Sequence, residues 1–431
     1  MLYLALDGRT STTADHGSDT QTSLQTHPSV RADILSSVLK QWGERHSTDP
    51  RRVLVLPPDA SRRHSFAGQL TRAAYDVLGT RLSDIMPTLG THHPMSPQEI
   101  ETMYEGVPPQ LFRDHDWRHD LVELGRVPAA EVAKLSEGLM NMDWPVQLNR
   151  LVAEGGHDLI LSIGQVLPHE IAGFANHSKN ILIGAGGADA IHRSHYLGAV
   201  YGMERIMGRA DNPVRQLFRS GMQHASHLPV LYLLTVVAPD EDGRPQLRGL
   251  FAGDDEECFE RAAALSGELN ITHVPEPADR VLAYMPEAEY GSTWLANKAI
   301  YRTRMAIADG GELTVVAPGV QRFGEDESLD RLIRRHGYRS AAEVAARVEA
   351  DPQLAAGLSA AAHLIHGSSE GRFRIRYCAP GLGREAVEAV GYEYVEPDEI
   401  DAMESAADLV IDNPALGLWM SRARSARSSP P

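Results

Sequence analysis

Short runs of consecutive apolar residues recur along the chain, and most are bounded by glycine, proline or polar residues. Runs of this length and composition are typical of strands buried on both faces of a sheet. We expect buried strands within residues 51–58, 157–164, 229–237, 279–286, 312–319 and 372–380. Each run contains valine, isoleucine or leucine and is too short for a helix that crosses a domain.

Between these strands the apolar residues adopt helical spacing. A helix is expected over residues 65–79, begun by Ser65 and ended by Gly79. Further helices are expected near 293–309 and over 383–391, with three helical stretches between the last two strands. Alternation of strand and helix in both halves of the chain predicts the α/β class, with two domains and mainly parallel sheets.

The predicted domain boundary lies in a proline-containing segment, residues 270–279. We expect an N-terminal α/β domain over residues 1–272 and a C-terminal α/β domain over residues 273–399. The C-terminal segment, about 400–431, is expected to pack back on the first domain.

Composition and charge exclude several classes of protein. The 431 residues are 42% hydrophobic and 23% charged, as in soluble globular proteins, and the net charge of −17 argues against nucleic acid as a partner. No apolar run reaches the roughly 18 residues of a membrane helix, and MLYLALDG lacks the features of a signal peptide. With only Cys258 and Cys378, no disulfide framework is implied, and a cytoplasmic location is expected.

Histidine is concentrated in the first half of the chain, where 15 of the 19 histidines precede residue 230. Any one of them could be an ordinary surface residue. As a group they favour chemistry, because histidine titrates near neutral pH and binds metals.

Two candidate stretches lie in the first hundred residues. PPDASRRHS (57–65) follows a predicted strand, at the edge where α/β sheets bind ligands, and its Asp59 and Arg62 could hold a carboxylate. The alternative is a helix start with an acidic residue at its N-terminus. TLGTHHPMSPQEI (88–100) places His92 and His93 in a loop just before a capping box, SPQE; the alternative is a solvated loop.

The third stretch, LPHEIAGFANHSKNILIGAGGADAIHRSH (167–195), holds four histidines and one lysine among glycines and apolar residues. A buried lysine tends to lose its charge, and a neutral amine is a nucleophile. The alternative for Lys179 is a side chain that extends to the surface.

The fourth stretch, EYGSTWLANKAIYRTR (289–304), places Lys298 near a helix start, where an anionic ligand would offset its unfavourable position. A surface lysine is the alternative. GLGREA (381–386) fits a dinucleotide fingerprint in form, but Pro380 interrupts the turn and no suitable acidic residue follows.

Together the four stretches resemble the nickel-pincer lactate racemase family. The family pattern is roughly D-x-T-R-P, G-T-H-R-P-M, P-H-x-x-A-G-F with a lysine and a later histidine, and Q-x-x-K. Here DASRR, GTHHPM, PHEIAGF, Lys179, His195 and LANK occupy those places. The resemblance extends from about Val53 to Val395, and the central stretch is its most specific part.

The resemblance implies a racemase or 2-epimerase of an α-hydroxy acid, with the active site in the cleft between the two domains. It implies a nickel-pincer nucleotide, derived from nicotinic acid, that is covalently linked to Lys179, with His195 as the protein ligand of a square-planar nickel. His92 and His169 match the acid/base pair, while Arg62 and Lys298 match the groups that bind the substrate carboxylate. Cofactor contacts are expected from Asp59, Gly173 and Phe174, and substrate contacts from His93 and Leu295.

The chain departs from the family pattern around the substrate. Leu295 replaces the glutamine, Arg63 a proline and His93 an arginine, and Asn176, His177 and Ser178 replace G-G-R. Residues 115–119, with His93, Arg63 and His177, are expected to form a roomy polar pocket for a substrate larger than lactate, such as an aldonic acid. Leu295 argues partly against this, because it removes a polar contact.

Two alternatives remain open at this point. One is a family member that has lost catalysis and only binds a small organic acid. The other is a hydrolase with zinc on His92, His93, His115 or His119, although the chain lacks an H-E-x-x-H motif. The expected partners are a small 2-hydroxy acid and the enzymes that make the cofactor, with no nucleic acid and no membrane.

Overall fold

The structure is a computed structural model that describes residues 2–7, 10–11 and 28–423. Its contacts divide the chain into two compact units. Unit 1 comprises Met1–Ile191 and Gly208–Leu269, and unit 2 comprises His192–Met207 and Asn270–Pro431. The sequence placed the break after residue 272 and did not anticipate that residues 192–207 lie with the second unit.

Unit 1 contains a seven-stranded sheet in the order β2-β1-β11-β10-β7-β3-β4. Its strands are β1 (Leu2–Asp7), β2 (Thr10–Ser11), β3 (Val53–Leu56), β4 (Leu82–Ile85), β7 (Leu159–Gln165), β10 (Val230–Pro239) and β11 (Pro245–Gly253). The four strands from β10 to β4 are parallel, whereas β11, β1 and β2 continue the sheet antiparallel.

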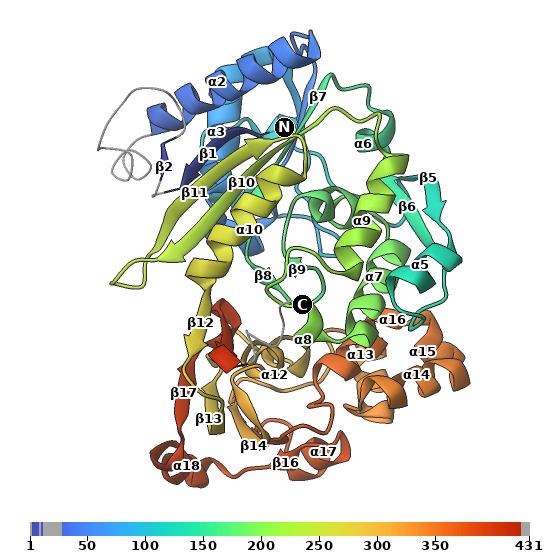
Figure 1. The fold of residues 1–431 in the computed structure, drawn as a ribbon, viewed down its shortest axis with the longest axis vertical. Coiled ribbons are helices and arrows are strands. Elements are labelled where there is room, and N and C mark those ends of the chain that lie inside the picture. The colour runs from blue at the N-terminus through green and yellow to red at the C-terminus, as the bar shows by residue number, and fades with distance from the viewer. Residues whose placement is uncertain (1, 8–9, 12–27, 424–431) are drawn as a thin grey trace. The chain divides into compact units, whose positions relative to one another are not determined.

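Helices cover both faces of this sheet. α2 (Pro28–His46) and α3 (Ala67–Leu78) pack on one face, and α10 (Glu256–Asn270) crosses the other (Figure 1). Alternate strand residues such as Val55, Leu161 and Leu233 meet Trp42 and Leu70 in the core beneath α2 and α3. This explains why the strands read as continuous apolar runs, since both faces are buried.

The remaining elements of unit 1 lie outside the seven-stranded sheet. They are α4 (Pro97–Met103), β5 (Leu121–Val127), α5 (Ala129–Leu135), β6 (Trp144–Asn149), α6 (Arg150–Glu154), β8 (Pro168–His169), β9 (Gly173–Phe174) and α9 (Pro213–His224). The predicted capping box at the start of α4 is confirmed, with Ser96 and Glu99 bonded reciprocally. α7 (Ala188–Tyr201) spans the division between the units and is followed by α8 (Met203–Ile206).

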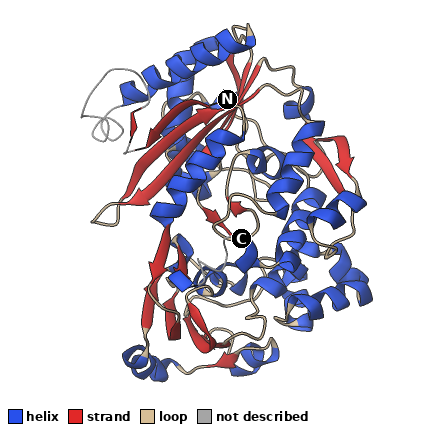
Figure 2. Cartoon of the chain, in the orientation of Figure 1, coloured by secondary structure: helices blue, strands red, loops and turns tan. Residues whose placement is uncertain are grey.

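Unit 2 contains a five-stranded sheet that is parallel throughout, in the order β16-β15-β14-β13-β17 (Figure 2). The strands are β13 (Ala278–Tyr284), β14 (Ile307–Val316), β15 (Arg374–Cys378), β16 (Glu393–Tyr394) and β17 (Leu409–Asp412). The helices are α11 (Thr293–Ala296), α12 (Lys298–Thr303), α13 (Glu327–His336), α14 (Ala341–Ala350), α15 (Pro352–Ala356), α16 (Leu358–His366), α17 (Arg384–Ala389) and α18 (Ile400–Ala406). A separate parallel pair joins β12 (Ile271–Val274) to β18 (Leu418–Ser421).

The fold is the α/β class that the sequence predicted, with mainly parallel sheets. The six predicted strands correspond to β3, β7, β10, β13, β14 and β15. Three helix predictions need correction. Four helices, α13 to α16, lie between β14 and β15, where three helical stretches were expected. The helix expected near 293–309 is two short helices that end at Thr303, because Ile307 already pairs with β13. Helix α3 begins at Ala67 after Phe66, which has a left-handed conformation, and Ser65 lies before the N-cap position, where its hydroxyl accepts the Ala67 N–H at 3.3 Å.

The C-terminal segment differs from its predicted place. Its described strands both pair within unit 2, β17 with β13 and β18 with β12. β17 pairs with the edge of β13 that β14 leaves unpaired, and β18 pairs with β12 outside the five-stranded sheet. Residues 424–431 of the predicted segment lie outside the described residues.

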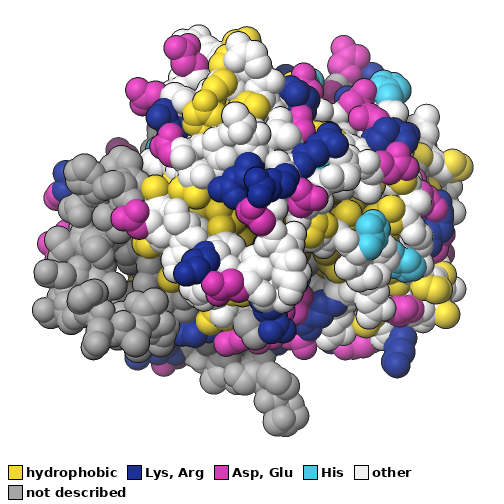
Figure 3. Space-filling view, turned by 90° about the horizontal axis from the view of Figure 1, so that it is seen from above, with side chains coloured by type: hydrophobic (Ala, Val, Ile, Leu, Met, Phe, Trp, Pro, Cys, Tyr) yellow, Lys and Arg dark blue, Asp and Glu magenta, His cyan; other side chains and the backbone are white. Residues whose placement is uncertain are grey.

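Acidic and basic side chains are interspersed on the face of the molecule in Figure 3, without a broad basic surface there. Among the described helices, none is both long and apolar enough to cross a membrane.

Candidate active site

Three loops of unit 1 leave the sheet at the same edge. β3, β4 and β7 are parallel neighbours, and a bridge between Pro58 and Thr88 continues their pairing beyond the strands. The loops that follow carry Asp59, His92 and His169. Ligands of open α/β sheets bind at this carboxyl edge, so the fold brings three predicted residues to the expected place.

Asp59 and His92 form a hydrogen-bonded pair across two of these loops. Oδ2 of the buried Asp59 lies 2.7 Å from Nδ1 of His92, whose side chain is 62% exposed. The other carboxylate oxygen accepts hydrogen bonds from the backbone N–H of Ser61, at 3.0 Å, and from its hydroxyl. An ionised carboxylate only accepts, so His92 carries its proton on Nδ1 and its Nε2 keeps a lone pair when the ring is neutral.

The surroundings of Asp59 favour the ionised form. Burial alone raises the pKa of this carboxyl, but hydrogen bonds from His92 and Ser61, together with the charge of Arg62, lower it overall. Asp59 therefore acts as the acceptor that orients His92. The sequence assigned Asp59 to the cofactor, and nothing in a 33-residue separation indicated the pairing with His92.

His169 is held in a different way. It lies opposite Gly173 in the short hairpin of β8 and β9, and its Nδ1 accepts the backbone N–H of Ile171 at 3.1 Å. A backbone N–H can only donate, so the neutral His169 ring carries its proton on Nε2. The two predicted acid/base histidines are thus held in opposite tautomers.

The segment before Lys179 has an unusual backbone. Asn176 and His177 have φ of 68° and 60°, in the left-handed region that favours glycine. Asparagine and histidine are among the side chains that most often adopt it. These two residues stand where the family pattern has glycines, so the departure in sequence retains a conformation that glycine would adopt freely.

Lys179 follows this turn and immediately precedes a five-residue π-helix, Asn180–Gly184. π-helical segments are rare and often occur at functional sites. Lys179 is partly buried and makes no hydrogen bond or ion pair with the part of the chain that the structure describes. Burial, and then the positive charges of Arg215 and Arg62, lower its pKa to about 8, against the opposing effect of Glu170. At pH 7 about one in ten of these amines is neutral, far more than for an ordinary lysine.

Asn180, which the sequence analysis missed, connects the three strand ends. Its Nδ2 donates to the Leu56 carbonyl at 3.3 Å and to the Ser162 hydroxyl at 3.0 Å, and its Oδ1 accepts the Thr88 hydroxyl at 2.8 Å. These partners belong to β3, β7 and the loop after β4. A polar residue directly after Lys179 in an apolar stretch was the one signal that could have found it.

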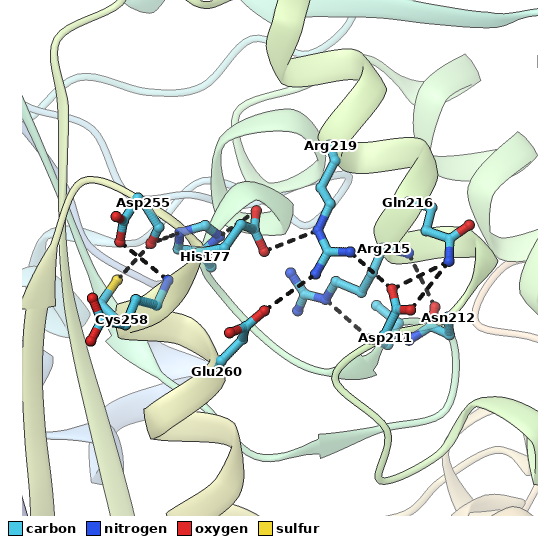
Figure 4. Close-up of polar contacts among 12 residues, drawn as sticks. His177, Asp211, Asn212, Arg215, Gln216, Arg219, Asp255, Cys258 and Glu260 are labelled. Carbon is cyan, nitrogen blue, oxygen red and sulfur yellow. Dashed lines mark hydrogen bonds and ion pairs between the residues drawn. The ribbon is translucent and has the colours of Figure 1, made fainter. Parts of the chain in front are cut away.

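The predicted roomy polar pocket is wrong for two of its histidines. His177 is buried, with its ring 3.9 Å from that of Tyr232 and its Nε2 3.2 Å from the Asp255 carbonyl (Figure 4). Burial, and then the charge of Arg215, lower its pKa to about 3, so it is neutral at pH 7. His115 is buried as well, against the Gly186 carbonyl at 3.0 Å. Both rings therefore make their hydrogen bonds in the protein interior and do not line an open pocket. Of the other predicted pocket residues, Arg63 and His93 are exposed.

The two residues of β9 that were assigned to the cofactor are closely packed. A Cβ at Gly173 would lie 1.8 Å from the Arg209 carbonyl oxygen, so a glycine is needed for this contact alone. Phe174 is buried, and its carbonyl accepts a hydrogen bond from Arg215. Their predicted contact with the cofactor stays a prediction.

The other predicted residues belong to unit 2. His192 and His195 lie in α7, and both are partly buried. Leu295 is in α11, and Lys298 is the first residue of α12, with its ammonium 5.9 Å from the ring centroid of Tyr290. Their roles stay predictions.

No group of three or more histidine, cysteine, aspartate or glutamate side chains that could hold a metal occurs among the described residues. Two of the four histidines considered for zinc form hydrogen bonds with carboxylates, His92 with Asp59 and His119 with Asp116. The nickel expected from the resemblance would need only one protein ligand besides the cofactor itself.

Comparison with known families finds a match in the first half of the chain. The lactate racemase N-terminal domain family matches residues 46–206, which include Asp59, His92, His169, Lys179 and His195. Residues 46–206 of the chain are therefore lactate racemase-like. No curated protein matches the chain.

Solved structures show that the chain shares its fold with other proteins. The crystal structure of a protein from Thermotoga maritima is 23% identical, with a TM-score of 0.78 over 93% of this chain and 99% of that one. The lactate racemase apoprotein from Thermoanaerobacterium thermosaccharolyticum is 16% identical, with a TM-score of 0.70 over 91% of this chain and 93% of that one. At these identities the likeness concerns the fold.

Proposed function

We propose that the protein is a racemase or 2-epimerase of α-hydroxy acids that carries a nickel-pincer nucleotide on Lys179. The observation that carries the proposal is the state of Lys179, a partly buried amine with a lowered pKa and no partner among the described residues. A lysine held so is suited to form a covalent bond through its nitrogen. The lactate racemase N-terminal domain over residues 46–206 supports the same assignment.

The residues present fit such a cofactor. Lys179 would hold it by a thioamide, and His195 would supply the nickel ligand. When bound, the cofactor supplies a reversible acceptor for the hydride of the substrate α-carbon, so that a 2-keto acid can be reduced again from its other face. The enzymes that make the cofactor are therefore expected partners.

The chain's own residues would handle the proton and the carboxylate. His92 takes the α-hydroxyl proton on Nε2, because Asp59 holds its Nδ1–H, while Nε2–H of His169 donates toward an oxygen. To give up this proton, His169 must first be protonated on Nδ1 as well, which releases the Ile171 N–H, because a neutral ring that lost Nε2–H would be an imidazolate. The ring that remains keeps Nδ1–H, and its Nε2 lone pair can act as the base in the opposite direction. Arg62 and Lys298 would bind the substrate carboxylate.

The proposed substrates include small 2-hydroxy acids as well as the larger, polar acids that the sequence suggested. Burial of His115 and His177 removes much of the support for a large polar pocket, so an aldonic acid is no better supported than a small 2-hydroxy acid. Leu295 in place of the family glutamine favours one alternative, a family member that binds an acid without turning it over.

The test is expression together with the cofactor-making enzymes, followed by intact-mass and nickel analysis. Wild type and Lys134→Ala, a control at an exposed lysine, should gain the cofactor mass and about one nickel, and Lys179→Ala should gain neither. An adduct that persists in Lys179→Ala would refute the attachment site.

Nickel content then separates His195→Ala, which should lose the metal, from its neighbour His192→Ala, which should keep it. Loaded protein is finally screened with single isomers of 2-hydroxy acids. Loss of optical or epimeric purity supports the racemase, and binding without conversion of any acid supports the alternative.

A further inference from the structure

Helix α9 contributes a buried cation to the loop that precedes Lys179. Arg215 is 1% exposed, and its guanidinium donates to the carbonyls of Ala172, at 3.1 Å, of Asn176, at 3.0 Å, and of Phe174. Its three bonds therefore reach every second carbonyl of residues 172–176.

This guanidinium makes no ion pair among the described residues. It stacks on Phe259, with its carbon 4.0 Å from the ring centroid, and the nearby Glu256 pairs instead with Arg219 at 3.2 Å. A buried charge without a counter-charge is costly, so an arginine is expected there only if its hydrogen bonds fix something.

The start of α9 holds the same loop from a second point. Asn212 caps the helix and also donates to the Ala172 carbonyl at 3.2 Å, while Gly173 packs directly on the Arg209 carbonyl. The bond from Arg215 to the Asn176 carbonyl lies at the left-handed turn of Asn176 and His177, three residues before Lys179.

We propose that Arg215 is a positioning residue, whose planar fork holds residues 172–176 in the conformation that presents Lys179 as an unpaired amine. The inference deepens the proposed function, on which its meaning for cofactor attachment rests. A lysine at position 215 would keep the charge but could not span three carbonyls.

Charge adds to this effect. Burial has the largest effect on the pKa of Lys179 and lowers it. The charges of Arg215 from α9 and Arg62 from the loop after β3 lower this pKa further, whereas Glu170, between β8 and β9, raises it. Arg215 is thus both a support of the loop and a like charge near the amine.

The experiment uses the apoprotein, so that it does not depend on the reaction. Arg215→Lys and Arg215→Met are compared with Arg219→Lys, a control one turn further along α9 whose partners are Asp211, Glu256 and Glu260. Amide exchange is measured over residues 172–180, and acetylation by limiting acetic anhydride is quantified by peptide mass. The whole chain has four lysines, so Lys40 and Lys134 serve as exposed references for Lys179.

Both Arg215 variants should exchange the amides of 172–180 at least about tenfold faster and should change the acetylation of Lys179 relative to Lys134, whereas Arg219→Lys should change neither. Wild-type exchange and acetylation in Arg215→Lys would overturn the proposal and leave only a charge effect. If Arg215→Met does not fold, Arg215→Lys decides alone. A failure to racemise any acid would refute the proposed function without affecting these measurements.

Discussion

Two regions of unit 1 hold their candidate side chains in opposite ways. The first region is the pair of loops that carry Asp59 and His92, and the second region is the segment from His169 to Asn180. His92 is mostly exposed and is oriented by a single carboxylate. In the second region, backbone groups and buried side chains support His169, His177 and Lys179. A change in the first region should therefore alter chemistry with little effect on the fold, whereas a change in the second should alter both.

The histidines of the two regions also differ in which ring nitrogen carries the proton. Asp59 leaves a lone pair on Nε2 of His92, and the Ile171 N–H leaves a proton on Nε2 of His169. In the proposed reaction His92 is thereby prepared as a base, whereas His169 must gain a proton on Nδ1 and release the Ile171 N–H before it can act as the acid.

Loss of either histidine gives the largest expected effect. His92→Ala and His169→Ala should each lower net epimerisation of the loaded enzyme by about 10²- to 10⁴-fold, because each turnover needs one base and one acid. With α-deuterated isomers, each variant should still reduce the cofactor with one isomer and not with the other. Equal reaction of both variants with both isomers would show that these histidines do not face the substrate from opposite sides.

Acid should weaken the second region through His177. The pKa of this ring is about 3 in the folded protein and about 6.5 when unfolded, so the unfolded chain binds an extra proton between these values. The free energy of unfolding should therefore fall as the pH falls below about 6.5, by on the order of 4 kcal/mol near pH 3.

Urea unfolding at a series of pH values measures this contribution. His177→Asn, which can keep the left-handed backbone, should flatten the pH dependence relative to wild type. His119→Asn, at an exposed histidine bonded to Asp116, should not. A parallel decline of stability in wild type and His177→Asn would assign the acid sensitivity elsewhere.

Asn180 should support stability in the second region. Asn180→Ala leaves the Leu56 carbonyl and the hydroxyls of Ser162 and Thr88 without this partner, which should cost about 1–3 kcal/mol. The midpoint of urea unfolding should fall with an unchanged slope, and Asn141→Ala, at an exposed position, is the matched control. A midpoint equal to wild type would remove Asn180 from the support of the segment.

Asp59→Asn tests the first region with the smallest expected change. The amide can donate to His92 Nδ1 and favour the wrong tautomer, so kcat should fall while KM and the urea midpoint stay near wild type. The loss should be well below the roughly 10⁴-fold that this change costs a buried catalytic triad, because the His92 side chain is 62% exposed. Ser61→Ala, which removes only the hydroxyl bond to Asp59, should have less effect. A loss of stability in Asp59→Asn instead of activity would contradict the separation of the two regions.

Much of the fold could be predicted from the sequence, because the strands that matter are buried on both faces and read as apolar runs. The antiparallel extension by β1 and β11 and the helices α2 and α10 were missed, since their residues lack an equally clear pattern. The end of the helical region at Thr303 was not visible either, because it depends on the pairing of Ile307 with a distant strand.

The candidate site was predictable as a set of residues through the family resemblance, but not as a set of contacts. Asp59 and His92 are far apart in the sequence, and so are Asn180 and Leu56; only the parallel order of the strands brings them together. The interior roles of His115 and His177 were missed because a histidine that accepts or donates one buried hydrogen bond looks, in sequence, like any other.

The contacts of Asn180 have a consequence for the order of events in the life of the protein. Its partners Leu56, Thr88 and Ser162 come from segments 124, 92 and 18 residues before it, so its position exists only once those segments have assembled. The turn that ends at Lys179 is completed at the same moment. Attachment of the proposed cofactor should thus follow folding, because a nascent or unfolded chain would present Lys179 as an ordinary protonated lysine.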